Sequence, residues 1–456
     1  MAILSFTVLV GLCQVKTNKT KSPSIKVGAE RTQLYLPLLE GKSVGIFANP
    51  TSTVGNSHLV DTLLALGVKI TVIFGPEHGF RGTAGAGEKV GNAIDEKTGI
   101  PVVSLYGAKR RPSAEDLKDV DVMIYDIQDV GVRFYTFISS LEEYIRSARE
   151  FNKPLLLLDR PNPNGFYVDG PVLDPKYRSF VGMQPIPIVY GMTPGEYATM
   201  LLGENWIKND SKENKEAMAV PMAEATVASA AVEREEADRK MENEEKGKTG
   251  NSCTGMEKIK ELWDRKEFSL MVICCENYSH KSLYELPVKP SPNLPNAQSI
   301  YLYPSTCLFE GTSLSEGRGT DKPFQLFGAP SLPKTLKSFT PQPNEGAKSS
   351  KHYGKVCYGW DLSGTTEQVL SQVKGKFQLK WLIEAYKLFP QKDSFFLVPK
   401  SGNMEQSFIT KLAGTNELWQ QIRSGKSEAE IRKSWEPALS NFKAIRKRYL
   451  LYEDFE

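Results

Sequence analysis

The 456-residue sequence has few of the side chains that form disulfides or bind structural metal ions, since it contains only six cysteines and four histidines. No two cysteines have the C-x-x-C spacing, so we predict neither a disulfide scaffold nor a structural zinc site, but buried and inert thiols. The sequence also has no large excess of positive or negative charge, because 57 basic and 54 acidic side chains leave a net charge of only +3. Such a balance gives no electrostatic footprint for nucleic acid, and we predict no nucleic-acid partner.

Common cofactor and nucleophile motifs are absent as well. The glycines at 82, 85, 87 and 91 lack the G-x-G-x-x-G spacing of dinucleotide-binding loops. The sequence contains neither a G-x-x-x-x-G-K-[ST] phosphate loop nor a G-x-S-x-G nucleophile elbow. We therefore predict that the protein uses no nucleotide, no other cofactor and no resident metal.

Apolar runs of more than strand length are confined to the start of the chain. Residues 1–12, MAILSFTVLVGL, precede Cys13 and a polar stretch through Lys26. This pattern is typical of an export signal with a lipid-attachment cysteine, and a misassigned start codon is the alternative. We expect residues 1–26 to be the signal and linker of a lipoprotein that is periplasmic or on the outer surface. No other run reaches the ~20 residues that span a bilayer, so we predict no membrane span.

From Lys42 onward, apolar runs of strand length alternate with helical patterns. We predict strands over 43–48, 70–74, 101–105, 122–125 and 155–158, and helices over 57–66 and 139–150. Short runs that are apolar on both faces indicate a parallel sheet covered by helices on both sides. Thr193-Pro194-Gly195-Glu196 has the pattern of a capping box and predicts a helix over 196–202. The pattern favours an α/β, Rossmann-like domain without the usual cofactor signature.

The chain is longer than one hydrophobic core normally serves, so two domains are expected. Residues 208–256 form a charged, low-complexity insertion that we expect to carry no chemistry. We predict a Rossmann-like domain over 27–207 and a smaller C-terminal α/β domain over 257–456. Strand character returns at 269–275. An amphipathic helix is predicted over 438–451, with Arg446-Lys447-Arg448 on its solvated face.

Polar side chains follow four of the predicted strands, at the edge where open parallel sheets bind ligands. They are Asn49 after the first strand, Glu77, His78 and Arg81 after the second, Asp126, Gln128, Asp129 and Arg133 after the fourth, and Asp159 and Arg160 after the fifth. One polar strand end is routine, but four together predict one site.

Glu77 is the best candidate for a catalytic acid, because it lies in a rigid Gly-Pro-Glu-His-Gly loop. Its spacing is equally compatible with an ion pair to Arg81 or a helix cap. In the second domain, residues 310–320, EGTSLSEGRGT, place acidic and basic side chains among glycines, which favours a polar-ligand loop over a plain surface turn. Pro290-Ser291-Pro292-Asn293 predicts a rigid turn that holds the Asn293 side chain at a fixed angle.

Five long motifs occur in a fixed order along the chain. They are GPEHGFRG at 75–82, DIQDVGVRFYT at 126–136, DRPNPNG at 159–165, PSPNLPN at 290–296 and FEGTSLSEGRGT at 309–320. Together they closely resemble the bacterial exo-β-N-acetylmuramidase family. The resemblance implies a Rossmann-like domain joined to a smaller α/β domain, with the active site in the cleft between them. It also implies release of N-acetylmuramic acid from the non-reducing end of peptidoglycan fragments, so that muropeptides are the expected partners.

The resemblance also implies roles for single residues. Glu77 matches the catalytic glutamate of the family, whereas Tyr190 stands where many members have histidine. Glycoside hydrolysis typically uses two carboxylates, and for the second we predict Glu316, with Asp126 next. The lactyl carboxylate of N-acetylmuramic acid suits bidentate binding by an arginine. The candidates are Arg81, Arg133 and Arg318, and Tyr135 is a candidate for an apolar face against the sugar ring.

Two other hypotheses remain open. One is a metal-dependent hydrolase that uses Asp126, Asp129 and His78. The other is a non-catalytic lipoprotein, in which the same cleft holds muropeptides without cleaving them. Insensitivity to chelators excludes the first, and cleavage of a chromogenic muramic acid glycoside excludes the second.

Overall fold

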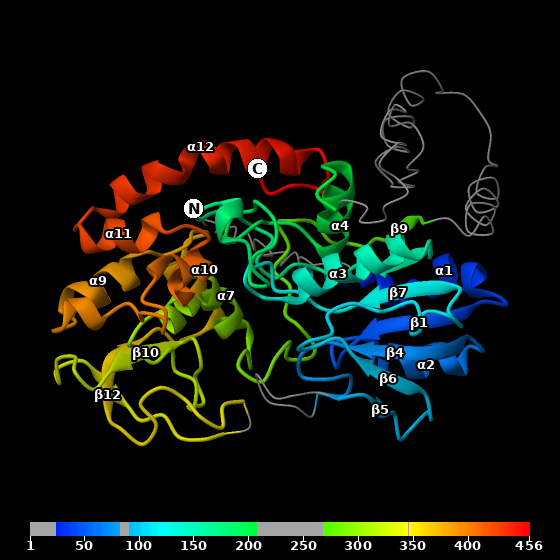
Figure 1. Ribbon diagram of the computed structural model, residues 1–456, viewed down its shortest axis with the longest axis horizontal. Helices are drawn as coiled ribbons and strands as arrows, with labels where there is room; N and C mark the ends of the chain where they lie inside the picture. Colours follow the sequence, from blue (N-terminus) through cyan, green and yellow to red (C-terminus); the bar gives the residue numbers. More distant parts are fainter. Residues whose placement is uncertain (1–23, 83–90, 208–267, 345) are drawn as a thin grey trace, which may run out of the picture.

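The structure, a computed structural model, describes residues 24–82, 91–207, 268–344 and 346–456 (Figure 1). Residues 1–23 of the expected export segment, with Cys13, and the whole expected insertion over 208–256 lie outside these residues. A sheet domain and a smaller domain lie side by side, and the long helix α12, Glu428–Lys447, extends over both (Figure 1).

Within the described residues, the first domain is built on a seven-stranded sheet of order β5-β6-β4-β1-β7-β8-β9. The short edge strand β5 is antiparallel, and its neighbours from β6 to β9 are parallel. In chain order the parallel strands run 3-2-1-4-5-6, which is the order of doubly wound Rossmann folds. The strands are β1 Ser43–Ala48, β4 Lys69–Gly75, β5 Ala93–Ile94, β6 Pro101–Ser104, β7 Val122–Asp126, β8 Leu155–Leu158 and β9 Leu270–Ile273. The prediction of a Rossmann-like parallel sheet is confirmed.

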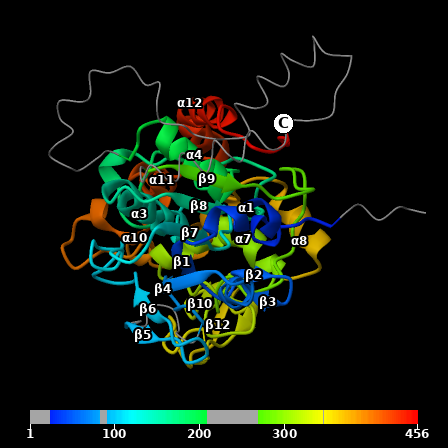
Figure 2. The same ribbon diagram turned by 90° about the vertical axis from the view of Figure 1, so that its right-hand side faces the viewer.

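Helices cover both faces of this sheet, as Figure 2 shows with α3 on one side and α1 on the other. They are α1 Thr32–Leu39, α2 Leu59–Ala65, α3 Phe137–Glu150 and α4 Pro194–Gly203. Ile46 of β1 packs in the cluster that contains α1 and α2. Phe47, the next residue, points the other way and meets Tyr144 of α3, with ring centroids 5.1 Å apart. Burial on both faces explains why the strands are continuous apolar runs.

The starts of two helices are set by capping side chains. Helix α2 begins later than predicted because Ser57–His58 forms strand β3 against β2, Thr53–Val54, and His58 caps the helix. Helix α4 begins with the predicted capping box, since the Thr193 hydroxyl accepts from the Glu196 amide and the Glu196 carboxylate accepts from the Thr193 amide.

The second domain packs short helices around an antiparallel sheet of order β10-β12-β11. Its elements are α7 Ala297–Thr306, the 3-10 helix η5 Cys307–Gly311, β10 Leu326–Ala329, β11 Lys337–Phe339, β12 Cys357–Asp361, α8 Thr366–Val373, α9 Lys380–Leu388, α10 Phe408–Ala413 and α11 Glu417–Arg423. A smaller C-terminal α/β domain is therefore present, as predicted.

The predicted domain boundary at residue 257 needs a correction. Strand β9 pairs in parallel with β8, with Leu155 opposite Leu270, and so it completes the sheet of the first domain. The change of composition at Lys208 lies inside the connection from β8 to β9. Low-complexity sequence there marks an insertion within a crossover, not the end of a domain.

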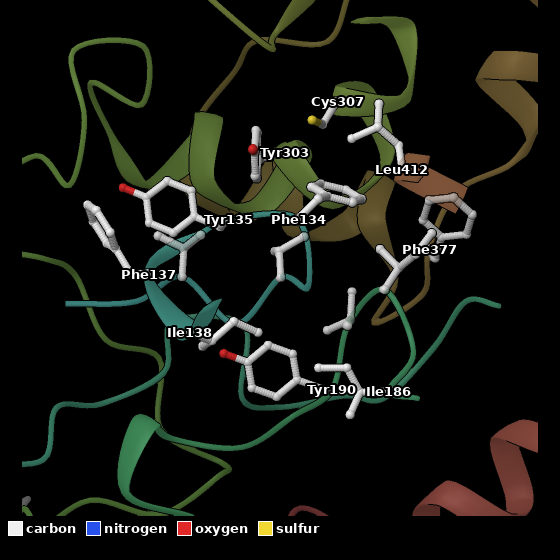
Figure 3. Close-up of a cluster of buried hydrophobic side chains, with 14 of the residues drawn as sticks. Phe134, Tyr135, Phe137, Ile138, Ile186, Tyr190, Tyr303, Cys307, Phe377 and Leu412 are labelled. Atoms are coloured by element: carbon white, nitrogen blue, oxygen red, sulfur yellow. The ribbon is translucent and has the colours of Figure 1, made fainter. Parts of the chain in front are cut away.

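The two domains share one hydrophobic cluster, part of which is shown in Figure 3. Phe134 and Tyr135, from the loop after β7, meet Tyr303 of α7 with ring centroids 5.5 and 6.0 Å apart. Leu412 of α10 belongs to the same cluster. Because these close-packed aromatic contacts join the domains, they fix how the loops on either side face each other.

The prediction that Arg446, near the end of α12, lies on a solvated helix face is also wrong. Its side chain is only 1% exposed and lies inside the protein instead of on a solvated face. The guanidinium donates to both carboxylate oxygens of Asp454 at 2.8 Å and to the Gly191 carbonyl oxygen at 2.9 Å. Helix α12 also begins at Glu428, before the predicted start at residue 438, because the many polar side chains of its first turns hide the helical pattern. The bidentate pair ties the C-terminal segment to α12, and the hydrogen bond to Gly191 ties α12 to the first domain.

Replacing Arg446 with Met is expected to lower the free energy of unfolding by about 3 kcal/mol, because Asp454 and the Gly191 carbonyl lose their buried donor. Urea denaturation measures the loss. The next residue provides the control, since the Lys447 side chain is 57% exposed and pairs with Glu456. Lys447→Met is expected to change stability by less than about 0.5 kcal/mol. Equal losses in the two variants would contradict a role for the buried pair.

Candidate active site

A cavity of about 380 Å³ opens between the two domains. Its walls come from the loops after β4, β6 and β7 on one side and from α7, η5 and the loop after η5 on the other. Five of the predicted site residues line it, namely Glu77, His78, Tyr135, Asn293 and Arg318. The other six, Asn49, Arg81, Asp126, Gln128, Arg133 and Glu316, are not among its lining residues.

Glu77 reaches the cavity because the chain turns sharply after β4. His78 and Gly79 have φ angles of 70° and 76°, and this left-handed turn ends the strand next to the glutamate. The Tyr106 hydroxyl donates to Glu77 Oε1 at 3.1 Å. Burial and the neighbouring Glu77 carboxylate raise the pKa of Tyr106, so the phenol keeps its proton and remains a donor. Glu77 is half-buried and held in one orientation at the cavity wall.

Arg318 lies on the opposite wall, between two glycines that the loop requires. Gly317 and Gly319 have φ angles of 81° and 78°, and a Cβ atom at either would lie within 2.8 Å of a backbone oxygen. The Arg318 guanidinium donates to Glu310 at 2.8 Å and lies 3.4 Å from Glu316. Burial opposes its charge, but these carboxylates outweigh burial and raise the pKa of Arg318. Its charge is therefore permanent but already compensated.

The two glutamates beside Arg318 differ in access to the cavity. Glu316 has a side chain only 4% exposed, with Lys351 Nζ at 3.0 Å, and does not line the cavity. Glu310 has a side chain 20% exposed and does line it. Both lie in the motif at 309–320, where spacing alone could not tell which one faces a ligand.

Two residues that were predicted to contact the substrate, Arg133 and Asp126, are buried and bonded to other protein groups. Arg133 is 0% exposed, and its guanidinium donates to the carbonyl oxygens of Pro171, Ile186 and Leu412. Its burial, with no carboxylate partner among the described residues, lowers the pKa of Arg133 to about 9. Arg133 therefore links the loops of the two domains, and the prediction that it binds a substrate carboxylate is not supported by its position.

Asp126 is likewise buried, in an ion pair with Arg160. The guanidinium donates to both carboxylate oxygens, at 2.5 and 2.9 Å, across the ends of β7 and β8. Asp129 accepts from the Tyr190 hydroxyl and the Gly131 amide, both at 2.6 Å, and burial raises its pKa to about 7. Neither carboxylate faces the cavity. Tyr190, at the family's histidine position, also lies in the core, as Figure 3 shows.

The remaining strand-end residues hold loops in place. Asn49 and Gln128 are each 2% exposed. Asn49 Oδ1 accepts from the Thr51 amide, and the Gln128 amide group donates to two backbone carbonyl oxygens. Arg81 pairs with Asp95 at 2.9 Å and with Asp61 at 3.4 Å. Irregular backbone at a buried sheet edge needs such partners, so polar strand ends do not all mark ligand contacts.

The sequence could have revealed two further cavity residues. Tyr106 and Arg110 follow the predicted strand over 101–105, and both line the cavity. The rule that ligands bind at the carboxyl ends of parallel strands applies there equally. Phe180, by contrast, lies in a long connection without a recognisable pattern.

Among the described residues, no cluster of three or more histidine, cysteine, aspartate or glutamate side chains has a geometry suited to a metal ion. Two of the three metal ligands considered above have other partners, since Asp126 pairs with Arg160 and Asp129 accepts from the Tyr190 hydroxyl. This part of the chain also contains no helix that is both long and apolar enough to cross a bilayer.

Comparisons with known proteins agree with the motif order. Two adjacent family models match, exo-β-N-acetylmuramidase NamZ, N-terminal, over residues 44–298 and its C-terminal counterpart over residues 301–452. The first match includes β9, in line with the sheet. Peptidoglycan β-N-acetylmuramidase NamZ of Bacillus subtilis is 36% identical over 96% of this chain and 94% of the relative.

Two crystal structures of Bacteroides fragilis proteins of the DUF1343 family have the same fold. One is 39% identical with a TM-score of 0.74 over 95% of this chain, and the other is 25% identical with a TM-score of 0.69 over 94%. Each match covers 100% of the solved chain. Taken with the two family models, these relationships show that the chain belongs to the exo-β-N-acetylmuramidase NamZ family.

Proposed function

We propose that this protein is a glycoside hydrolase that releases N-acetylmuramic acid from the non-reducing end of peptidoglycan fragments. The observation that carries the proposal is the cavity between the domains, with Glu77 on one wall and Glu310 with Arg318 on the other. Two carboxylates that face a shared cavity are what glycoside hydrolysis requires. The kinship with the Bacillus subtilis enzyme supports the same activity and substrate class.

In the proposed mechanism, Glu77 gives its proton to the glycosidic oxygen as the bond from that oxygen to the sugar's anomeric carbon breaks. The Tyr106 hydroxyl orients this carboxyl group through its 3.1 Å hydrogen bond. Glu310 supplies the second carboxylate, which stabilises the positive charge on the sugar and serves either as nucleophile or as base for water. The Arg318 guanidinium donates to Glu310 at 2.8 Å and so fixes the direction of this carboxylate.

The sugar ring is expected to lie against the aromatic floor of the cavity. Tyr135 and Tyr303 both line the cavity, and the Tyr135 hydroxyl is fixed by donating to the Pro290 carbonyl oxygen at 2.8 Å. Asn293 is fixed in the same way by its bond to the Gly346 carbonyl oxygen. Rigid apolar rings beside a few oriented polar groups are typical of small-ligand sites.

The test of this function is release of the chromophore from a chromogenic N-acetylmuramic acid β-glycoside, with and without a chelator such as EDTA. We expect equal release in both samples, because the proposed mechanism uses only carboxylates. Binding of muropeptides without release would favour the non-catalytic wall-binding alternative. Loss of release with chelator, and its recovery on adding a divalent metal, would favour the metal-dependent hydrolase.

We further propose that the protein is exported and carries a lipid on Cys13, so that it acts on wall fragments outside the cytoplasm. The support is the apolar run over residues 1–12 followed by that cysteine. Mass spectrometry of the protein from its native host tests this, because lipidation makes Cys13 the first residue of the mature chain. A mature chain that retains Met1 would contradict it.

A further inference from the structure

The acidic substituent of the sugar needs a cation, and the cavity offers two. Of the arginines that the structure describes, Arg110 and Arg318 line the cavity. Arg318 is compensated by Glu310 and Glu316. A further carboxylate brought to Arg318 would meet the repulsion of these two, so the acid's partner has to be sought at Arg110.

Arg110 carries a charge that no carboxylate balances in the part of the chain that the structure describes. Its guanidinium lies over the Phe180 ring, 3.8 Å from the centroid. This contact places the cation over the ring, and no described side chain or carbonyl oxygen accepts a hydrogen bond from Arg110, so its N–H donors are available for a bidentate carboxylate. Arg110 is exposed, and pairing with a ligand there avoids the large desolvation cost of a buried cation.

The basic neighbours of Arg110 make the contrast clear. Lys109 pairs with Asp116 at 2.5 Å, and Arg111 lies 3.5 Å from Glu150. Neither neighbour lines the cavity. Three consecutive basic residues therefore have different surroundings, and the one that faces the cavity is the one without a protein carboxylate among the described residues.

The wall that carries Arg110 also carries the proposed acid. Arg110 lies close enough to Tyr106 that its charge partly offsets the rise in the pKa of Tyr106 caused by burial and by Glu77. Tyr106 in turn donates a hydrogen bond to Glu77. A sugar with its glycosidic oxygen at Glu77 would thus have a cation on the same side of the cavity. We propose that Arg110 binds the lactyl carboxylate of N-acetylmuramic acid and so selects this sugar over N-acetylglucosamine. The assignment rests on the proposed function.

The test compares two substrates that differ in one charge, a chromogenic N-acetylmuramic acid glycoside and its lactyl methyl ester. Arg110→Gln is expected to lower kcat/KM for the acid by ~10- to 100-fold, the worth of charge-assisted hydrogen bonds, mainly through KM. For the ester, kcat/KM is expected to stay within about threefold of the wild type. Arg110→Lys keeps the charge without the planar fork and is expected to retain part of the preference for the acid.

Arg111→Gln is the matched control, because it removes the adjacent positive charge outside the cavity and is expected to leave both substrates unaffected. An Arg110→Gln variant that keeps the wild-type preference for the acid, or that loses both substrates equally, would overturn the assignment. If the wild-type protein cleaves neither glycoside, the proposed function itself fails, which is a separate outcome.

Discussion

Replacing Glu77 with Gln is expected to lower kcat for release of N-acetylmuramic acid from a natural disaccharide by ~10²- to 10⁴-fold, the usual contribution of a positioned general acid. Gln has the same shape and still accepts the hydrogen bond that Tyr106 donates at 3.1 Å. Its amide N–H groups are too weakly acidic to transfer a proton to the departing oxygen. The thermal midpoint of unfolding is expected to stay near that of the wild type, since Glu77 is only half-buried.

The dependence on the leaving group distinguishes an acid from any other role of Glu77. A nitrophenolate leaves readily without a proton, so Glu77→Gln is expected to slow the chromogenic glycoside far less than the disaccharide. Tyr106→Phe provides a control that removes only the orienting hydrogen bond and is expected to cost ~10-fold or less. Equal losses on both substrates would argue for a nucleophile, and unchanged turnover would remove Glu77 from the mechanism.

The sequence predicted the sheet well because its strands are buried on both faces. Successive side chains of β1, such as Ile46 and Phe47, enter different clusters, and this requires the continuous apolar runs that a parallel sheet leaves in a sequence. Helix α12 was predicted less well, since it packs through a narrow apolar stripe and through one buried charge, Arg446. A buried arginine has the same sequence pattern as an exposed one until its partner is known, and Asp454 lies beyond the helix.

The candidate site was predictable where the backbone itself does the positioning. Glu77 and Asn293 lie in Gly- and Pro-rich turns, and both line the cavity. Several of the predicted residues that do not line the cavity are charged residues whose partners are distant in sequence. Arg133 binds the carbonyl of Leu412 in the other domain, and Asp126 meets Arg160 on the neighbouring strand. Such pairings follow from the arrangement of the strands and domains, which one sequence does not contain.

The second carboxylate is predicted as Glu316 from the sequence and proposed as Glu310 from the cavity lining, and variants of the two residues distinguish these assignments. Glu310→Gln is expected to lower kcat by ~10²-fold or more, because the carboxylate that faces the cavity loses its charge. Its stability is expected to fall less than that of Glu316→Gln, because the Glu310 side chain is 20% exposed and the Glu316 side chain only 4%. Glu316→Gln is expected to cost about 3 kcal/mol of stability, because it removes a buried partner of Arg318 and Lys351.

The two variants are therefore expected to differ, with the larger loss of activity in Glu310→Gln and the larger loss of stability in Glu316→Gln. Steady-state kinetics on the disaccharide and urea denaturation of the same preparations measure both effects. Glu310→Ala offers an independent readout, since a small anion such as azide can occupy the vacated space and restore turnover of the chromogenic glycoside. A stable Glu316→Gln protein without activity, beside an active Glu310→Gln protein, would return the role to Glu316. Otherwise Glu316 serves to hold Arg318, and through it Glu310, at the cavity wall.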